Sequence, residues 1–224
     1  MILLFTAFQF SFGQQKPKAE MIHELGLVGG CENYWASIDL LLDKLVDENE
    51  SVGYIVLYGN KDNVIQTIIY KEWVAGHLKR RKLDDRFKMF DENRLKVVRG
   101  KPSANFKIEM WKVSSDAEKS FVEFNTNFEY SLAIKKPLIF YDNNFDPGGL
   151  CPYLDSQKVF ADFLQANPNL YGNVVIYENS LNNFYKAKKE MLKYMKNISQ
   201  NRLRFFRSTN SWDGSYELWF IPDK

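Results

Sequence analysis

Two nearly identical eight-residue segments recur within this chain of 224 residues. Residues 93–100 read NRLKVVRG, and residues 201–208, which lie 108 positions further on, read NRLRFFRS. The same displacement places Glu109 of KIEMWKV on Glu217 of SYELWFI. Self-similarity at a fixed spacing is the signature of a repeat architecture. The chain is therefore predicted to fold as two related units.

Two further matches lie upstream of these segments. GYIVLYGN at residues 53–60 resembles GNVVIYEN at residues 172–179, which lie 119 positions later, and Cys31 matches Cys151 at a displacement of 120. The displacement is smaller for the later blocks, so the first copy is longer in the stretch between residues 60 and 93. Four matching blocks in the same order indicate an internal duplication.

Each copy shows the same succession of helix and strand patterns. Apolar residues return at three- and four-residue spacing in NYWASIDLLLDKLV and in YLDSQKVFADFLQ, which predicts a helix in each copy. A short β-branched run, YIVLY or NVVIY, then predicts a strand. A second helix is expected over residues 64–82 and residues 181–196. Two strands follow, and the turn residues between them predict that they pair antiparallel.

The predicted fold class is α/β, of the α+β sandwich type, with two tandem repeats that each read helix, strand, helix, strand, strand. The first repeat is assigned to residues 21–113 and the second to residues 147–224. Residues 114–146 form a connector that contains two extended-looking pieces, FVEFNTNFEYS and PLIFYD. Either piece fits as an added strand of either sheet, and the sequence does not place them.

The strand that ends in LYGNKDN, within this order of elements, resembles the OmpA-like peptidoglycan-binding domain. In that family a Gly-x-x-Asp turn after the strand and an Arg on the next helix hold the charged groups of a cell-wall peptide. Gly59 and Asp62 match the turn, whereas residues 74–77, where the Arg would stand, read VAGH. The resemblance implies two tandem OmpA-like repeats and a ligand site at Asn60 and Asp62, with peptidoglycan as a partner.

The first thirteen residues, MILLFTAFQFSFG, carry no charge and end in small residues. This pattern predicts a signal peptide over residues 1–13, although no Lys or Arg precedes the apolar run. A buried N-terminal strand or helix is the alternative. No other stretch approaches the ~18 apolar residues that a membrane-spanning helix needs. We therefore expect an exported protein of the periplasm or cell envelope, with no transmembrane segment after removal of the signal.

The charge balance argues against nucleic acid as a partner. The chain has 30 basic and 28 acidic residues, for a net charge of +2. Proteins that bind nucleic acid carry a basic excess that attracts phosphates. With 45% hydrophobic residues the composition is that of an ordinary globular protein with packed cores.

The last strand of each copy carries large apolar residues on both of its faces. Alternation places Trp111 beside Glu109 on one face, and Trp219 beside Glu217 on the equivalent face. If helices cover only one face of each sheet, the two tryptophans lie on the open side, where an aromatic patch is costly or functional. Either the two sheets meet through these faces, or the tryptophans contact a partner.

The repeated arginines have a structural and a functional interpretation. If the last two strands of each copy pair antiparallel, Arg99 faces Glu109 and Arg207 faces Glu217. Such cross-strand pairs contribute about 0.2–1 kcal/mol each. We favour this structural role over binding of an acidic ligand.

Cys31 and Cys151 occupy equivalent positions before the first helix of each copy. In an oxidising compartment an even pair of cysteines suggests a disulfide. Two buried thiols inherited from one ancestral unit are the alternative. Metal-binding spacings such as Cys-x-x-Cys are absent from the sequence, so no metal site is expected.

The sequence shows little that supports catalysis. Its two histidines, His23 and His77, have no neighbouring pattern that builds a catalytic triad, and no phosphate loop or nucleophile elbow occurs. We predict no enzyme activity and no cofactor. The expected function is an exported binding or scaffolding protein of the bacterial cell envelope that contacts peptidoglycan or another envelope protein. The alternatives are a protein-interaction module with a decayed ligand site and an envelope hydrolase with an unrecognised site.

Overall fold

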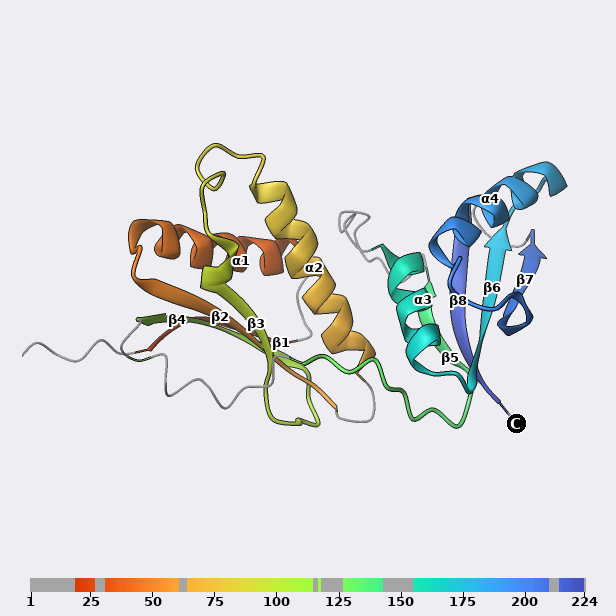
Figure 1. The fold of residues 1–224 in the computed structure, drawn as a ribbon, viewed down its shortest axis with the longest axis horizontal. Helices are drawn as coiled ribbons and strands as arrows, with labels where there is room; N and C mark the ends of the chain where they lie inside the picture. The colour runs from red at the N-terminus through yellow and green to blue at the C-terminus, as the bar shows by residue number, and fades with distance from the viewer. Residues whose placement is uncertain are drawn as a thin grey trace, which may run out of the picture.

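The computed structural model describes residues 19–26, 31–60, 64–114, 117, 127–142, 155–209 and 214–223. These residues form four α-helices and two four-stranded mixed sheets, with the helices of each unit on one face of its sheet (Figure 1). The predicted mixed α/β class is confirmed, and the arrangement is compatible with the α+β type.

The first unit is a sheet with the strand order β1-β4-β2-β3. β4 runs antiparallel to both β1 and β2, whereas β3 lies parallel to β2 at the edge. Its elements are β1 (Glu20–Gly26), α1 (Cys31–Asp47), β2 (Ser51–Tyr58), α2 (Ile65–Arg81), η1 (Glu92–Arg94), β3 (Leu95–Arg99) and β4 (Lys107–Ser114).

The second unit repeats this topology, with the strand order β5-β8-β6-β7 and the same parallel and antiparallel pairings. In both units a strand precedes the first helix; the sequence patterns did not predict β1, whereas β5 lies in PLIFYD, a candidate strand that they did not place. Its elements are β5 (Leu138–Asp142), α3 (Ser156–Ala166), β6 (Leu170–Tyr177), α4 (Leu181–Tyr194), η4 (Gln200–Arg202), β7 (Leu203–Ser208) and β8 (Ser215–Pro222).

The predicted antiparallel pairing of the last two strands is wrong. β3 and β4 are not neighbours, because β2 lies between them, and the same holds for β7 and β8 around β6. A helical crossover joins β2 to β3, which is how parallel neighbours are connected. The predicted pair of Arg99 and Glu109 therefore does not form, since Arg99 stands opposite Leu57 while Glu109 stands opposite Val56. The equivalent pair of Arg207 and Glu217 fails for the same reason.

A glycine near the start of the central strand brings the first helix of each unit close to its sheet. A Cβ on Gly53 would lie 2.6 Å from Leu45 Cδ1, and one on Gly172 would lie 2.7 Å from Leu164 Cδ1. Glycine within a strand often marks such a close approach. The helix α1 presses a stripe of apolar side chains onto the sheet at this place, namely Tyr34, Ile38, Leu41, Leu42 and Leu45.

The repeated Asn-Arg-Leu segment closes the connection between the first helix and the central strand. Arg94 donates from Nη2 to the carbonyls of Leu45 and Glu48, both at 2.6 Å, and from Nε to the carbonyl of Ser51 at 3.0 Å. The last carbonyls of a helix have no partner within the helix, so an arginine at this place satisfies them. Arg202 repeats these bonds in the second unit, to the carbonyls of Leu164, Asn167 and Leu170.

The two units contact each other through the helix α2 and the segment before β5. Val64, Ile65 and Ile68, at the beginning of α2, belong to the buried cluster that forms the core of the second unit. The segment is fixed by Asn167, whose Nδ2 donates to the carbonyl of Tyr130 at 2.6 Å and whose Oδ1 accepts from the amide of Leu132 at 2.8 Å. PLIFYD, within the predicted connector at 114–146, thus supplies β5 of the second sheet.

Candidate functional site

Each sheet has one face turned away from its helices, which we call its open face. Residues that stand opposite one another on neighbouring strands share a face. The first open face contains Met21, Glu24, Val52, Tyr54, Val56, Tyr58, Lys96, Val98, Lys107, Glu109, Trp111 and Val113. The second open face contains Ile139, Asp142, Tyr171, Asn173, Val175, Tyr177, Arg204, Phe206, Ser208, Ser215, Glu217, Trp219 and Ile221.

A glutamate lies at the centre of the first open face and is fully paired. Tyr58 Oη donates to Glu109 Oε2 at 2.8 Å, and Trp111 Nε1 donates to the same oxygen at 3.0 Å. Lys107 Nζ donates to Glu109 Oε1 at 2.5 Å and lies 4.6 Å from the centroid of the Tyr58 ring. Burial raises the pKa of Glu109, but these three hydrogen bonds outweigh it and hold the pKa below its usual range.

The second open face repeats the glutamate, the tyrosine and the tryptophan, but not the lysine. Tyr177 Oη donates to Glu217 Oε1 at 2.6 Å, and Trp219 Nε1 donates to Glu217 Oε2 at 2.8 Å. The repeat places Ser215 where the first unit has Lys107. None of the ion pairs found within the described part of the chain involves Glu217.

Two buried polar atoms of the second open face lack a hydrogen-bond partner in the structure, Ser215 Oγ and Asn173 Oδ1. Ser215 itself is only 8% exposed. Buried polar atoms are nearly always paired, so each unpaired one calls for an explanation such as an absent ligand or water. Both residues stand on the face that carries Glu217.

The two open faces also differ in burial. Val56, Val98 and Val113 of the first are almost completely buried, and Ala19 and Ala117 pack against the cluster that they form. On the second open face Phe206 is 46% exposed and Ile139 is 38% exposed. The second open face therefore exposes apolar side chains beside Glu217, a carboxylate with no ion pair to any residue that the structure describes.

The tryptophans lie on the open faces, as the alternation in the sequence predicts. The idea that the two sheets meet through these faces is wrong for the described residues, because the buried cluster around Trp111 contains side chains of the first unit alone. The units meet through α2 instead. Contact of Trp111 or Trp219 with a partner stays a prediction.

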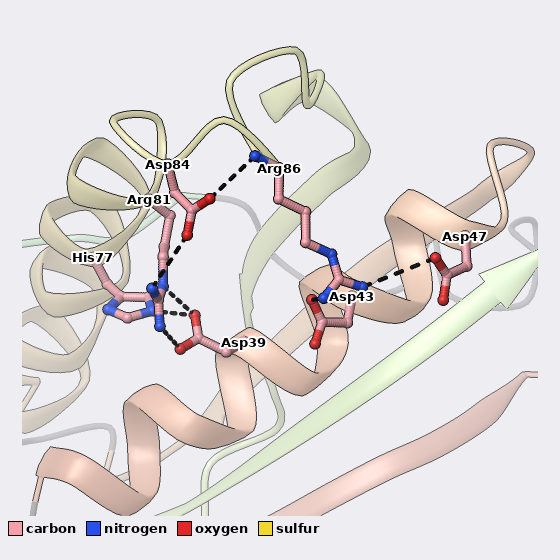
Figure 2. Close-up of polar contacts among 7 residues, drawn as sticks. All are labelled: Asp39, Asp43, Asp47, His77, Arg81, Asp84 and Arg86. Atoms are coloured by element: carbon pink, nitrogen blue, oxygen red, sulfur yellow. Dashed lines mark hydrogen bonds and ion pairs between the residues drawn. The ribbon is translucent and has the colours of Figure 1, made fainter.

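A second polar cluster joins the two helices of the first unit (Figure 2). His77 Nε2 lies 2.7 Å from Asp39 Oδ1, and Arg81 donates to both oxygens of the same carboxylate. Burial raises the pKa of Asp39, but the hydrogen bonds from His77 and Arg81 outweigh it and hold the pKa below its usual range. An ionised Asp39 only accepts hydrogen bonds, so His77 donates from Nε2.

The histidine of this cluster is enclosed and is not placed for catalysis. His77 is 2% exposed, and the Trp35 ring stacks on it with a centroid separation of 5.7 Å. A general base must reach the proton that it abstracts, and a buried imidazole between two helices does not reach a substrate. Asp43 and Asp47 bind Arg86 on the same side of α1 (Figure 2). We interpret the cluster as a clamp between α1 and α2.

Sequence reasoning missed both clusters for a simple reason. Asp39 and His77 are 38 positions apart, and Tyr58 and Glu109 are 51 positions apart, so no local motif joins them. The sequence signal for the Asp39 cluster was the spacing of four between His77 and Arg81 on one helix. The sequence signal for the Glu109 cluster was the repeated Glu-x-Trp.

Of the predicted ligand pair, Asn60 is exposed just beyond the end of β2, and Asp62 lies outside the described residues. The predicted signal peptide at 1–13 and Cys151 also lie outside them, and Cys31 is the first residue of α1. The ligand site, the signal and the disulfide therefore stay predictions. Within the described ranges no group of three His, Cys, Asp or Glu residues is arranged to hold a metal ion, and no helix is long and apolar enough to cross a membrane.

Comparison with protein-family models gives no match, and comparison with curated proteins gives no significant match either. Proposals about function therefore depend on the geometry of the open faces and on the sequence patterns.

Proposed function

We propose that the protein is an exported, non-catalytic binding or scaffolding protein of the bacterial cell envelope. The observation that carries the binding role is the second open face, which exposes Phe206 and Ile139 on the same side as Glu217, a carboxylate without an ion pair among the described residues. Large accessible apolar patches on a soluble domain mark interaction sites. The signal pattern at residues 1–13 supports export, and the OmpA-like resemblance supports the envelope as the destination.

Two features support peptidoglycan as a partner. After its first strand each unit reads helix, strand, helix, strand, strand, which is the order that the OmpA-like resemblance implies. Asn60 is exposed directly after the central strand and precedes Asp62, the counterpart of the family's ligand-binding Asp. The exposed Asn60 would place a wall ligand beyond the end of β2.

Sedimentation with intact peptidoglycan sacculi tests this proposal. The purified protein is expected to co-sediment, and Asp62→Ala is expected to abolish the effect by removing the carboxylate that pairs with a cationic group of the cell-wall peptide. Asp85→Ala, which changes an exposed carboxylate in the loop after α2, is the matched control and should leave co-sedimentation intact. Failure of the unchanged protein to sediment would exclude the wall as a ligand.

A protein-interaction module is the second candidate, and the second open face favours it directly. This surface carries Tyr171, Tyr177, Phe206 and Trp219, and aromatic side chains are enriched in the cores of protein interfaces. Binding of a protein partner at this face does not depend on Asp62, so a negative sedimentation result with sacculi would not argue against this second candidate.

A further inference from the structure

We propose that the second open face binds a protein segment that presents a lysine, with the lysine ammonium placed between Glu217 and Tyr177 and with apolar neighbours lying on Phe206 and Ile139. The proposal rests on the binding role proposed above, and it does not depend on peptidoglycan as a ligand.

The first unit shows the completed arrangement within the same chain. The ammonium of Lys107 bonds to Glu109 and lies over the Tyr58 ring, which places a cation between a carboxylate and an aromatic face. Charge-assisted hydrogen bonds are about twice as strong as neutral ones. The hydroxyl of Tyr58 and the indole of Trp111 hold the carboxylate in place for this cation.

The second unit keeps the receptor and has lost the cation. Tyr177 and Trp219 hold Glu217 in the same way, at 2.6 Å and 2.8 Å. Ser215 replaces the lysine, and its buried hydroxyl oxygen has no hydrogen-bond partner in the structure. A carboxylate that two neutral donors hold in place can accept a further, charge-assisted hydrogen bond from an ammonium group. An external lysine restores the pairing that the first unit makes internally.

Burial of the apolar positions gives the second half of the argument. On the first open face Val98 is 1% exposed and Val113 is 0% exposed. At the corresponding positions of the second open face, Phe206 is 46% exposed and Ile221 is half-buried. The second open face thus accepts apolar contacts that the first open face already has. A ligand that matches both properties carries a primary ammonium next to apolar side chains.

These properties favour a protein segment over a cell-wall fragment. The polar sugars and short peptide of a wall fragment offer an ammonium without the apolar side chains that Phe206 and Ile139 would bury. A peptide with alternating lysine and apolar residues satisfies the charge and the aromatic surface together.

The indole N–H signals of Trp219 and Trp111 provide a direct readout, because both groups donate to the glutamates in question. The probe is acetyl-Val-Lys-Val-amide, and its uncharged counterpart is acetyl-Val-norleucine-Val-amide. Titration of the ¹⁵N-labelled protein with the lysine peptide should shift the Trp219 signal saturably and leave the Trp111 signal in place. The norleucine peptide should bind at least about tenfold more weakly, which is the loss of one charge-assisted contact.

Three variants make the test specific. Glu217→Gln should weaken the response of Trp219 at least about tenfold, and Ser215→Lys should remove it because the new lysine occupies the site from within the chain. Glu190→Gln, an exposed carboxylate of α4 in the same unit, is the matched control and should respond as the unchanged protein does.

Equal responses to the two peptides, no saturable shift of Trp219, or full binding by the folded Ser215→Lys variant would overturn the proposal. A shift of Trp219 by soluble muropeptides but not by the lysine peptide would also overturn it and assign the face to the cell wall. Failure of sedimentation with sacculi together with a lysine-dependent shift would exclude peptidoglycan as a ligand and support this inference.

Discussion

The two open faces stand on equivalent strands and share a glutamate held by a tyrosine and a tryptophan, but they differ in the side chains around it. On the first, Val98 is 1% exposed and Lys107 pairs with Glu109. On the second, the corresponding positions are Phe206, which is 46% exposed, and Ser215. The strand order and pairing of the two sheets are the same. Duplication thus preserves the backbone arrangement, while the surface that it carries is free to diverge.

Residues that are identical in the two units form the scaffold, and residues that differ mark specialisation. Arg94 and Arg202 make the same carbonyl contacts, and so they explain why their segment recurs. Asp39, by contrast, corresponds to Lys158, so the clamp to His77 belongs to the first unit alone. Comparison of the two copies within one chain thus distinguishes scaffold residues from specialised residues.

An aspartate at the equivalent edge-strand positions 98 and 206 should give the largest difference between the two units in the free energy of unfolding that is lost. Val98→Asp places an unpaired charge at a buried position and is expected to lower the free energy of unfolding by about 3–5 kcal/mol. Phe206→Asp changes an exposed position and should lower it by less than about 1 kcal/mol. Urea denaturation of the two variants measures both values. Equal losses would show that the second open face is buried in solution.

The shared arginine should give similar effects in both units. Arg94→Met and Arg202→Met each leave carbonyls at the end of a helix without their charged donor, which should cost about 1.5–3 kcal/mol. Hydrogen exchange of the amides in β2 and β6 reports the two units separately. A loss in one unit with none in the other would contradict the equivalence of the two contacts.

Removing the lysine from the first unit and adding one at the equivalent position of the second should change the stability of the two units in opposite directions. Lys107→Met leaves Glu109 without its cation on a buried face and should destabilise the first unit by about 1–2 kcal/mol. Ser215→Lys adds the pair to the more exposed second face, where a gain below about 1 kcal/mol is expected. Thermal denaturation followed by the indole N–H signals of Trp111 and Trp219 checks the sign of the change in each unit. Stabilisation by Lys107→Met would refute the role of this ion pair.

Acid should weaken the first unit through Glu109. Its pKa is lowered from 4.5 in the folded protein, so the unfolded state binds the proton more tightly. The stability from this carboxylate is fully present above pH about 4.5 and is lost as the pH falls through the lowered pKa. Urea denaturation between pH about 6 and about 3 should therefore show a smaller pH dependence for Glu109→Gln than for the unchanged protein. The same pH dependence in the variant and the unchanged protein would show that Glu109 does not contribute to the loss of stability in acid.

Local patterns predicted the helices well and the strand pairing poorly. The periodicity of residues 64–82 predicts a helix that the structure places at Ile65–Arg81, because apolar spacing reports directly on helix faces. The order of strands depends on crossovers, and the turn residues between β3 and β4 equally suit a loop that passes across β2. β1 was missed because its side chains are mostly exposed, so it carries no clear apolar alternation.

The open faces were predicted in part. Period-two alternation placed Trp111 and Trp219 on them, since that geometry is local to one strand. Lys107 and Trp111 lie on the same strand as Glu109, but the third partner, Tyr58, comes from β2 and depends on strand pairing that the sequence patterns did not supply. The difference between Lys107 and Ser215 was visible in the aligned copies, but its meaning required the contacts of the glutamate.

The beginning of α2 contributes Val64, Ile65 and Ile68 to the core of the other unit, and this has an evolutionary consequence. A tandem duplication first produces modules that recombination can separate again. Once a helix of one copy fills the core of its neighbour, a recombinant that inherits a single copy carries a cavity or an uncovered apolar helix end. The two copies are then inherited as one unit, and their surfaces can acquire separate roles without the risk of being parted.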